Sequence, residues 1–163
     1  MGTVGSSLIK GIDKQEIINA LDSFHAYELV VMHWYLAVHN RLEGQAALVL
    51  GEMFEGEAEE SLGHAKKFAA RVAQLGGAVT GDPSRFVEIS PLDRFSLPSS
   101  NSDVKEILSQ AVEGERLAIK AYSEFLEQVK DKDVVTYYEV LEVLKDEIEH
   151  EDEIETILSN PDR

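Results

Sequence analysis

The feature that most constrains the fold is the spacing of apolar side chains in four long segments. In the first segment, Ile17, Leu21 and Phe24 begin a stripe that continues through Val31 and Tyr35. Apolar residues three and four positions apart lie on one face of an α-helix. Each segment is therefore predicted to be one long amphipathic helix, over about residues 13–41, 45–75, 103–130 and 134–158.

Local signals mark where these helices begin and end. Asp13 and Asp103 each precede an apolar stripe and have a glutamate three residues later, which is typical of a helix N-terminus. Gly76–Gly77 predicts the end of the second helix. Asp131–Lys132–Asp133 predicts a tight turn between the third and fourth helices.

The connection over residues 76–102 separates the helices into two pairs. It is polar, carries three prolines, and is far longer than an ordinary helix connection, with one helical turn predicted at Pro91–Phe95. The sequence therefore predicts an all-α fold over residues 13–163, an antiparallel four-helix bundle with one long crossover between helices two and three. A coiled-coil rod is the alternative, but it would not need this interruption. Residues 1–12 are expected to be a flexible N-terminal tail.

Composition excludes several functions. The 163 residues contain no cysteine, which excludes disulfides and thiolate metal sites. There are 31 acidic and 15 basic residues, so the chain at −16 repels nucleic acid and anionic membrane surfaces and attracts cations. No apolar stretch is long enough to cross a membrane, and the N-terminus has no secretory pattern, so we expect a cytoplasmic protein.

Polar residues interrupt the apolar stripes at the same level of all four helices. Glu28, His64, Glu115, Glu147 and His150 stand where apolar residues would be expected. A buried carboxylate costs several kcal/mol unless it is paired or binds a metal. The pair Glu147 and His150 lies on one helical face, so it can hold one ion while the carboxylate reaches a second. Carboxylates with two imidazoles favour iron or manganese over structural zinc.

The two halves of the chain repeat this pattern. Glu28 and Tyr35 recur 87 residues later as Glu115 and Tyr122, and the two histidines are 86 residues apart. A pseudo-twofold axis would then gather the inward-facing acids and imidazoles at the middle of the bundle. Tyr35 and Tyr122 are expected to pack there and to hydrogen-bond to a site carboxylate.

The sequence resembles the ferritin-like di-iron superfamily, which includes bacterioferritins, Dps-like proteins and rubrerythrin-type domains. The matching stretches are HAYELVVMHWY, HAKKFAARVAQLGG, GERLAIKAY and LKDEIEHEDEIE. The resemblance implies two iron ions per subunit, with manganese as the alternative metal. It makes Glu28 and Glu115 terminal ligands and Glu147 a bridge, with His64 and His150 on one metal each.

The second helix departs from the family pattern. A bridging glutamate is expected three residues before His64, and this chain has Ser61 there. We predict that Glu60, at a spacing of four, completes this side of the site. Glu57, one turn earlier, is the alternative. If neither reaches the site, the centre is mononuclear or asymmetric.

Further expectations follow from the resemblance. Leu62 stands where bacterioferritins have their haem-ligating methionine, so no haem of that kind is expected. Only five residues follow Leu158, which leaves no room for the fifth helix of 24-subunit cages and favours a homo-oligomeric, dodecameric Dps-like cage. The tail carries only Lys10, so a basic DNA-binding arm is not expected.

The leading hypothesis is an iron-storage and detoxification protein with di-iron ferroxidase activity, which oxidises Fe(II) with O2 or H2O2. The alternative is a non-storage di-iron or di-manganese oxidase or peroxidase of rubrerythrin-like type, and a third is a metal-free acidic bundle that binds a partner protein. Other polar residues are expected at the surface or at subunit contacts, namely His25, His33, His39, Asp131, Asp133 and Asp146.

Overall fold

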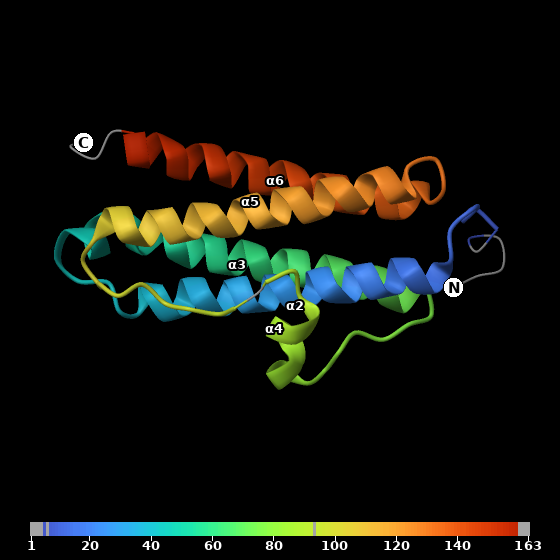
Figure 1. Cartoon of the computed structure of the whole chain (residues 1–163), viewed down its shortest axis with the longest axis horizontal. Coiled ribbons are helices and arrows are strands. Elements are labelled where there is room, and N and C mark those ends of the chain that lie inside the picture. The colour runs from blue at the N-terminus through green and yellow to red at the C-terminus, as the bar shows by residue number, and fades with distance from the viewer. Residues whose placement is uncertain (1–4, 6, 93, 160–163) are drawn as a thin grey trace.

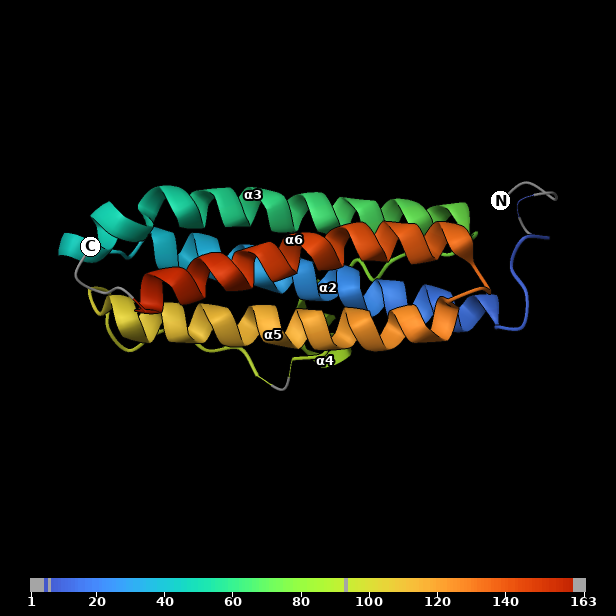
Figure 2. The same cartoon turned by 90° about the horizontal axis from the view of Figure 1, so that it is seen from above.

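The computed structural model describes residues 5, 7–92 and 94–159, and four long antiparallel helices dominate it (Figures 1 and 2). The helices are α2 (Lys14–His39), α3 (Gly44–Gln74), α5 (Val104–Val129) and α6 (Val134–Ser159). Packing is most extensive within the α2–α3 hairpin and within the α5–α6 hairpin. The predicted four-helix bundle with a long crossover between its second and third helices is confirmed.

The helix ends follow from short-range chemistry. The carboxylate of Asp13 accepts the backbone N–H of Gln15 at 2.9 Å, and that of Asp103 accepts the N–H of Glu106 at 3.0 Å. Both aspartates therefore satisfy free N–H groups of a first helical turn. Gly76 ends α3 with φ +85°, a backbone conformation that favours glycine.

The crossover contains a short helix in a different place from the one predicted. The helical residues are η1 (Pro83–Arg85) and α4 (Phe86–Ile89), whereas the described residues of Pro91–Phe95 are not helical, so that prediction was wrong. The physical reason is capping: Asp82 accepts the N–H of Ser84 at 3.0 Å, and Pro83 supplies the backbone angle of a first turn.

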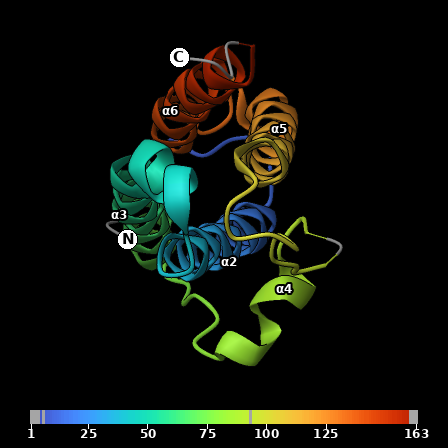
Figure 3. The ribbon, with the colours of Figure 1, turned by 90° about the vertical axis from the view of Figure 1, so that its left-hand side faces the viewer.

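The crossover is tied to α2 along its length, and α4 lies outside the bundle against that helix (Figure 3). Asp22 accepts hydrogen bonds from the backbone N–H and the hydroxyl of Thr80, at 2.7 and 2.8 Å. Further along, the indole N–H of Trp34 donates to the carbonyl of Ser96 at 2.9 Å. The returning chain is therefore held on the α2 side of the bundle.

The apolar core is divided into two clusters, one toward each end of the bundle. One cluster includes Ile17, Phe24, Phe68, Tyr122 and Val140, and the other includes Tyr35, Leu50, Phe54, Leu108 and Ile154. On every long helix, the residues between the two clusters include buried polar side chains. The core thus encloses a polar layer at mid-height.

A buried ion pair joins α3 to the turn between α5 and α6. The guanidinium of Arg71 donates to both carboxylate oxygens of Asp133 at 3.0 and 2.8 Å, and to the hydroxyl of Thr136 at 2.9 Å. Asp133 is only 1% exposed, so the prediction that it is a surface charge was wrong. The sequence pattern could not show this, because the partner is 62 residues away.

Part of the predicted tail contacts the bundle. Ile9 and Ile12 pack against the first core cluster, and the backbone N–H of Lys10 donates to the carbonyl of Lys132 at 2.9 Å. Residues 1–4 and 6 of that tail lie outside the described residues. Among the helices that the structure describes, none combines the length and the apolar character needed to cross a membrane.

Candidate metal centre

The polar layer between the two apolar clusters consists of carboxylates, an imidazole and a hydroxyl that are at least nine-tenths buried. Each long helix contributes, and the residues are Glu28, Glu57, Ser61, His64, Glu115 and Glu147. Four carboxylates within one core would repel one another and lose their hydration. The layer is therefore stable only with bound cations or protons.

Three residues form what we call the first half-site: Glu28 on α2, His64 on α3 and Glu147 on α6. Nδ1 of His64 lies 3.0 Å from Oε1 of Glu147 and 3.7 Å from Oε2 of Glu28. Despite these short distances, Nδ1 of His64 is the one buried side-chain nitrogen or oxygen in the described part of the chain that forms no hydrogen bond. A nitrogen placed between two carboxylates without a hydrogen bond fits a metal ligand.

The second half-site consists of Glu57 on α3, Glu115 on α5 and His150 on α6. Nδ1 of His150 lies 3.1 Å from Oε2 of Glu57 and 4.0 Å from Oε2 of Glu147. The Glu147 carboxylate therefore lies between the two imidazoles, with one oxygen toward each. This position suits the bridging role that the sequence predicts for Glu147.

Two acids at the rim contact the outer nitrogens of the imidazoles. Nε2 of His64 lies 3.2 Å from Asp146, and Nε2 of His150 lies 3.1 Å from Glu60. In a neutral imidazole such a contact favours the proton on Nε2, so Nδ1 can bind a metal once the metal has displaced its proton. Asp146 is one-third exposed, so it is a surface charge as the sequence suggested, but it also contacts the inward-facing His64.

Two tyrosine hydroxyls cross from one helix hairpin to the other. Tyr35 on α2 donates to Glu115 on α5 at 2.5 Å, and Tyr122 on α5 donates to Glu28 on α2. The expectation that both tyrosines hydrogen-bond to a site carboxylate is confirmed. Each hydrogen bond holds a predicted terminal ligand in one orientation.

The ionisation of the cluster shows how strongly it needs positive charge. Burial raises the pKa of Glu28, Glu115 and Glu147, and it raises the pKa of Glu57 to about 7. Burial alone would lower the pKa of His64, but the carboxylates of Glu147 and Glu28 outweigh it and raise that pKa to about 11. The cluster therefore retains protons at neutral pH, and a divalent cation would replace them.

The structure brings together five of the six residues proposed as ligands from the sequence, namely Glu28, His64, Glu115, Glu147 and His150. The sixth, Glu60, lies at the exposed rim, where it groups with His64 and Asp146. The buried carboxylate beside His150 is that of Glu57, the alternative that the sequence left open.

Three further histidines lie outside both half-sites. Nδ1 of His25 contacts the carbonyl of Ala65 at 2.9 Å, and Nδ1 of His39 contacts the carbonyl of Gly51 at 2.9 Å. His33 lies against the ring of Phe95 of the crossover. The contacts of His25 and His39 hold α2 against α3.

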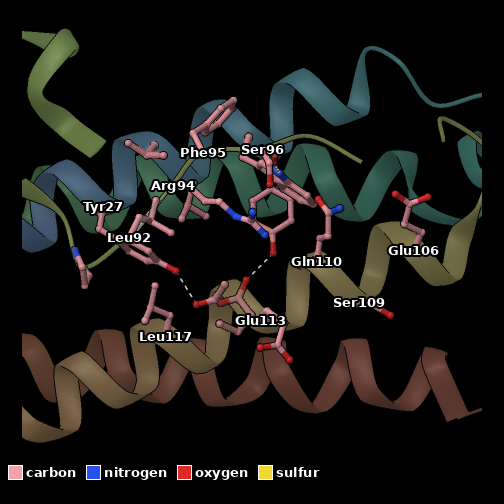
Figure 4. Close-up of a pocket in the computed structure, with 18 residues that line it drawn as sticks. Tyr27, Leu92, Arg94, Phe95, Ser96, Glu106, Ser109, Gln110, Glu113 and Leu117 are labelled. Carbon is pink, nitrogen blue, oxygen red and sulfur yellow. Dashed lines mark hydrogen bonds between the residues drawn. The ribbon is translucent and has the colours of Figure 1, made fainter. Parts of the chain in front are cut away.

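A large cavity opens beside the second half-site (Figure 4). Its volume is about 720 Å³, and it lies between α2, α5 and the crossover. Its lining includes the aromatic rings of Tyr27, Trp34 and Phe95, and Glu115 with its partner Tyr35. A smaller cavity of about 460 Å³ approaches the same half-site between α3 and α6, and it contains the carboxylates of Glu52, Glu57, Glu60 and Glu153 beside His150.

A comparison with protein families agrees with this geometry. The family model described as a ferritin-like domain matches residues 18–163. The chain belongs to the ferritin-like family. The ferritin-like match covers α3, α5 and α6 in full and α2 from residue 18, and therefore every candidate ligand in both half-sites.

Individual relatives extend this result. The ferritin-like chain is 28% identical over 149 residues to a DNA protection during starvation protein of Pyrococcus furiosus, covering 91% of this chain and 80% of that one. A structure of a dodecameric thioferritin, the bacterioferritin-related protein of Bacteroides fragilis, is 26% identical with a TM-score of 0.89 and coverages of 96% and 92%. A ferritin-like diiron-carboxylate protein of Bacillus anthracis is 26% identical with a TM-score of 0.77 and coverages of 91% and 99%.

Proposed function

We propose that this protein oxidises and stores iron, with Fe(II) as the substrate and the two half-sites as its binding positions. The observation that carries the proposal is the pair of carboxylate–imidazole groups in the middle of the bundle, with Nδ1 of His64 lacking a hydrogen bond. Hard carboxylate oxygens with one imidazole per ion suit Fe(II) and Mn(II). Membership of the ferritin-like family supports iron over manganese.

The proposed reaction balances with Fe(II), protons and the oxidant alone. Two Fe(II) ions give one electron each to H2O2, which takes up two protons and leaves as two waters. With O2 as the oxidant, the same two electrons and two protons yield H2O2. Burial of the first half-site keeps bulk water away from its ion, and Glu28, Glu57, Glu115 and Glu147 balance the charge that rises on oxidation.

Storage requires a shell, and we propose that this chain forms a dodecamer. The dodecameric Bacteroides fragilis protein supports this assembly, because its structure aligns over 96% of this chain. A formal charge of −16 per chain would also concentrate cations around such a shell. We assign no role to nucleic acid, since the same charge repels phosphates.

The test is Fe(II) oxidation by the purified full chain. Fe(II) is bound without oxygen, O2 or H2O2 is then added, and Fe(III) is followed by its near-ultraviolet absorbance. Glu147→Ala and His150→Ala should lower the rate by more than the roughly 10- to 100-fold that is typical of losing an outer-shell partner. Glu149→Ala, an exposed position on the same helix, is the matched control. Unchanged rates in the two ligand variants would refute the proposal.

The cavity beside Glu115 favours a second candidate function, a non-storage oxidase or peroxidase. A volume of about 720 Å³ with an aromatic lining is in the range of small-molecule sites. Gel filtration and iron loading separate the two candidates. A shell elutes at about twelve chain masses and retains many ions per chain, whereas a dimeric oxidase does neither.

A further inference from the structure

We propose that the large cavity between α2, α5 and the crossover binds a two-ring aromatic carboxylate, with Arg94 as the residue that holds the carboxylate group. The cavity volume of about 720 Å³ lies in the upper half of the range of small-molecule sites, so it suits two fused rings better than one. Three observations support this ligand class: the rigid aromatic wall, the position of Arg94, and the contacts of the nearby acids. The binding requires no metal, so the inference stands apart from the proposed function.

The aromatic rings in the cavity wall are held in fixed positions. The indole N–H of Trp34 donates to the carbonyl of Ser96 at 2.9 Å, and its ring packs edge-on against Tyr35 with the ring centres 5.3 Å apart. The hydroxyl of Tyr27 donates to the carbonyl of Gly114 at 2.6 Å. A planar ligand can therefore pack against these rings without the entropic cost of ordering them, and ring–ring contacts stabilise binding beyond the area that they bury.

Arg94 brings a positive charge into this cavity. It belongs to the lining, and Figure 4 shows its side chain extending from the crossover toward the middle of the cavity. Within the described part of the chain, no carboxylate lies at ion-pair distance from Arg94. A guanidinium presents parallel N–H groups that match the two oxygens of a carboxylate. Arg94 can therefore bind an anionic ligand without first breaking an ion pair to a described residue.

Two acids of the lining are already engaged by the fold. Both carboxylate oxygens of Glu106 accept hydrogen bonds from Ser99, at 2.7 and 3.0 Å. The carboxylate of Glu113 lies 2.9 Å from the guanidinium of Arg116. The net charge of −16 is spread over the whole chain, and at about 0.15 M salt charges more than about 8 Å apart are largely screened. The unpaired charge that faces a ligand is that of Arg94, which favours a carboxylate over an amine.

The inner wall of the cavity is formed by a candidate metal ligand and its partner. Glu115 belongs to the lining, and it accepts the hydroxyl hydrogen of Tyr35 at 2.5 Å. The carboxylate of Glu115 therefore already has a donor from the fold. A ligand in the cavity would lie beside the second half-site without needing to replace any of its side chains.

The experiment measures binding of naphthalene-2-carboxylate to the purified, metal-free full chain by isothermal titration calorimetry. The neutral naphthalene-2-carboxamide, which has the same rings, is the matched ligand. We expect saturable binding of one carboxylate per chain, with an affinity at least about tenfold higher than that of the amide, as expected for hydrogen bonds between charged groups. An absence of saturable binding, or equal affinities for the two ligands, would overturn the inference.

Three variants test the site, with the fold of each checked by circular dichroism. Arg94→Gln should lower the affinity for the carboxylate at least about tenfold and leave that for the amide unchanged. Arg85→Gln removes an equal charge from an exposed position of the crossover outside the cavity and should change neither affinity. Gln110→Trp fills the cavity from α5 and should weaken both ligands. Equal losses in the two arginine variants, or full binding by Gln110→Trp, would refute the site.

Trp34 reports where the ligand binds, because it is the only tryptophan in the chain. Replaced by 5-fluorotryptophan, it gives a single fluorine NMR resonance, which should shift during the titration with the Kd found by calorimetry. A resonance that does not move would place the ligand elsewhere and refute the inference.

The inference and the proposed function fail in different ways. If the carboxylate binds as expected but Fe(II) is not oxidised, only the proposed function is wrong. If Fe(II) is oxidised but the carboxylate does not bind, only the inference is wrong.

Discussion

Removing the carboxylate of Asp133 should destabilise the bundle more than any surface substitution. In the native protein this carboxylate accepts two hydrogen bonds from Arg71, one from the hydroxyl of Thr136 at 2.6 Å and one from the backbone N–H of Thr136 at 3.2 Å. Arg71 is 4% exposed, so Asp133→Ala leaves a guanidinium buried without a counter-ion. Breaking one side of a buried ion pair costs about 3–5 kcal/mol.

The assay is unfolding of the metal-free protein by heat and by urea. For a chain of this length, each kcal/mol shifts Tm by roughly 2–4 °C, so Asp133→Ala should lower Tm by about 10 °C. Asp131→Asn removes an equal charge two residues away at an exposed position and should leave Tm nearly unchanged. The double variant Arg71→Met with Asp133→Ala should recover much of the loss, because neither charge is then buried alone. Equal Tm values for Asp133→Ala and Asp131→Asn would refute the argument.

The same ion pair predicts a dependence on pH. Burial would raise the pKa of Asp133, but hydrogen bonds from Thr136 and Arg71 outweigh it and lower that pKa. The pKa of this carboxylate is lower in the folded protein than in the unfolded chain, where it is roughly 3.9. The carboxylate therefore stabilises the fold fully when the pH is above the unfolded pKa. This stabilisation is lost as the pH falls through the folded pKa. Relative to wild type, the penalty of Asp133→Ala should therefore shrink below about pH 4.

Three further predictions concern single positions. Gly77→Ala places a Cβ 2.9 Å from an Ile18 methyl and should destabilise the protein by about 1–3 kcal/mol in urea unfolding, whereas Gly81→Ala, in open space, should not. Tyr122→Phe leaves a buried carboxylate without its hydroxyl donor and should cost about 1–3 kcal/mol in the metal-free protein, and unchanged stability would contradict the role of that hydrogen bond. Asp146→Ala should weaken Co(II) binding roughly 10- to 100-fold in an equilibrium titration, and unaltered affinity would show that Asp146 does not orient its imidazole.

The four long helices could be predicted from the sequence because their determinants are local. The apolar spacing, the caps at Asp13 and Asp103, and Gly76 lie within a few residues of the helix ends that they set. The short helix of the crossover was misplaced because Asp82 and Pro83 together gave a stronger local signal than the proline at position 91.

The candidate site was predictable where the internal repeat constrains it and not where the repeat is broken. Glu28 and Glu115 occupy equivalent positions, and the structure places both within the polar layer. Ser61 breaks the repeat, so sequence spacing alone could not decide between Glu60 and Glu57. Both carboxylates reach His150 on α6 at 3.1 Å, and they differ in burial, because the side chain of Glu57 is 7% exposed and that of Glu60 is 47% exposed.

Each half-site takes its residues from both helix hairpins. The first combines Glu28 and His64 of the α2–α3 hairpin with Glu147 of α6, and the second combines Glu115 and His150 of the α5–α6 hairpin with Glu57 of α3. Two ions bound in these half-sites would therefore act as cross-links between hairpins that otherwise meet across a layer of like charge. Amide exchange should accordingly slow on metal binding at the surfaces where the hairpins dock, and less between the two helices of one hairpin.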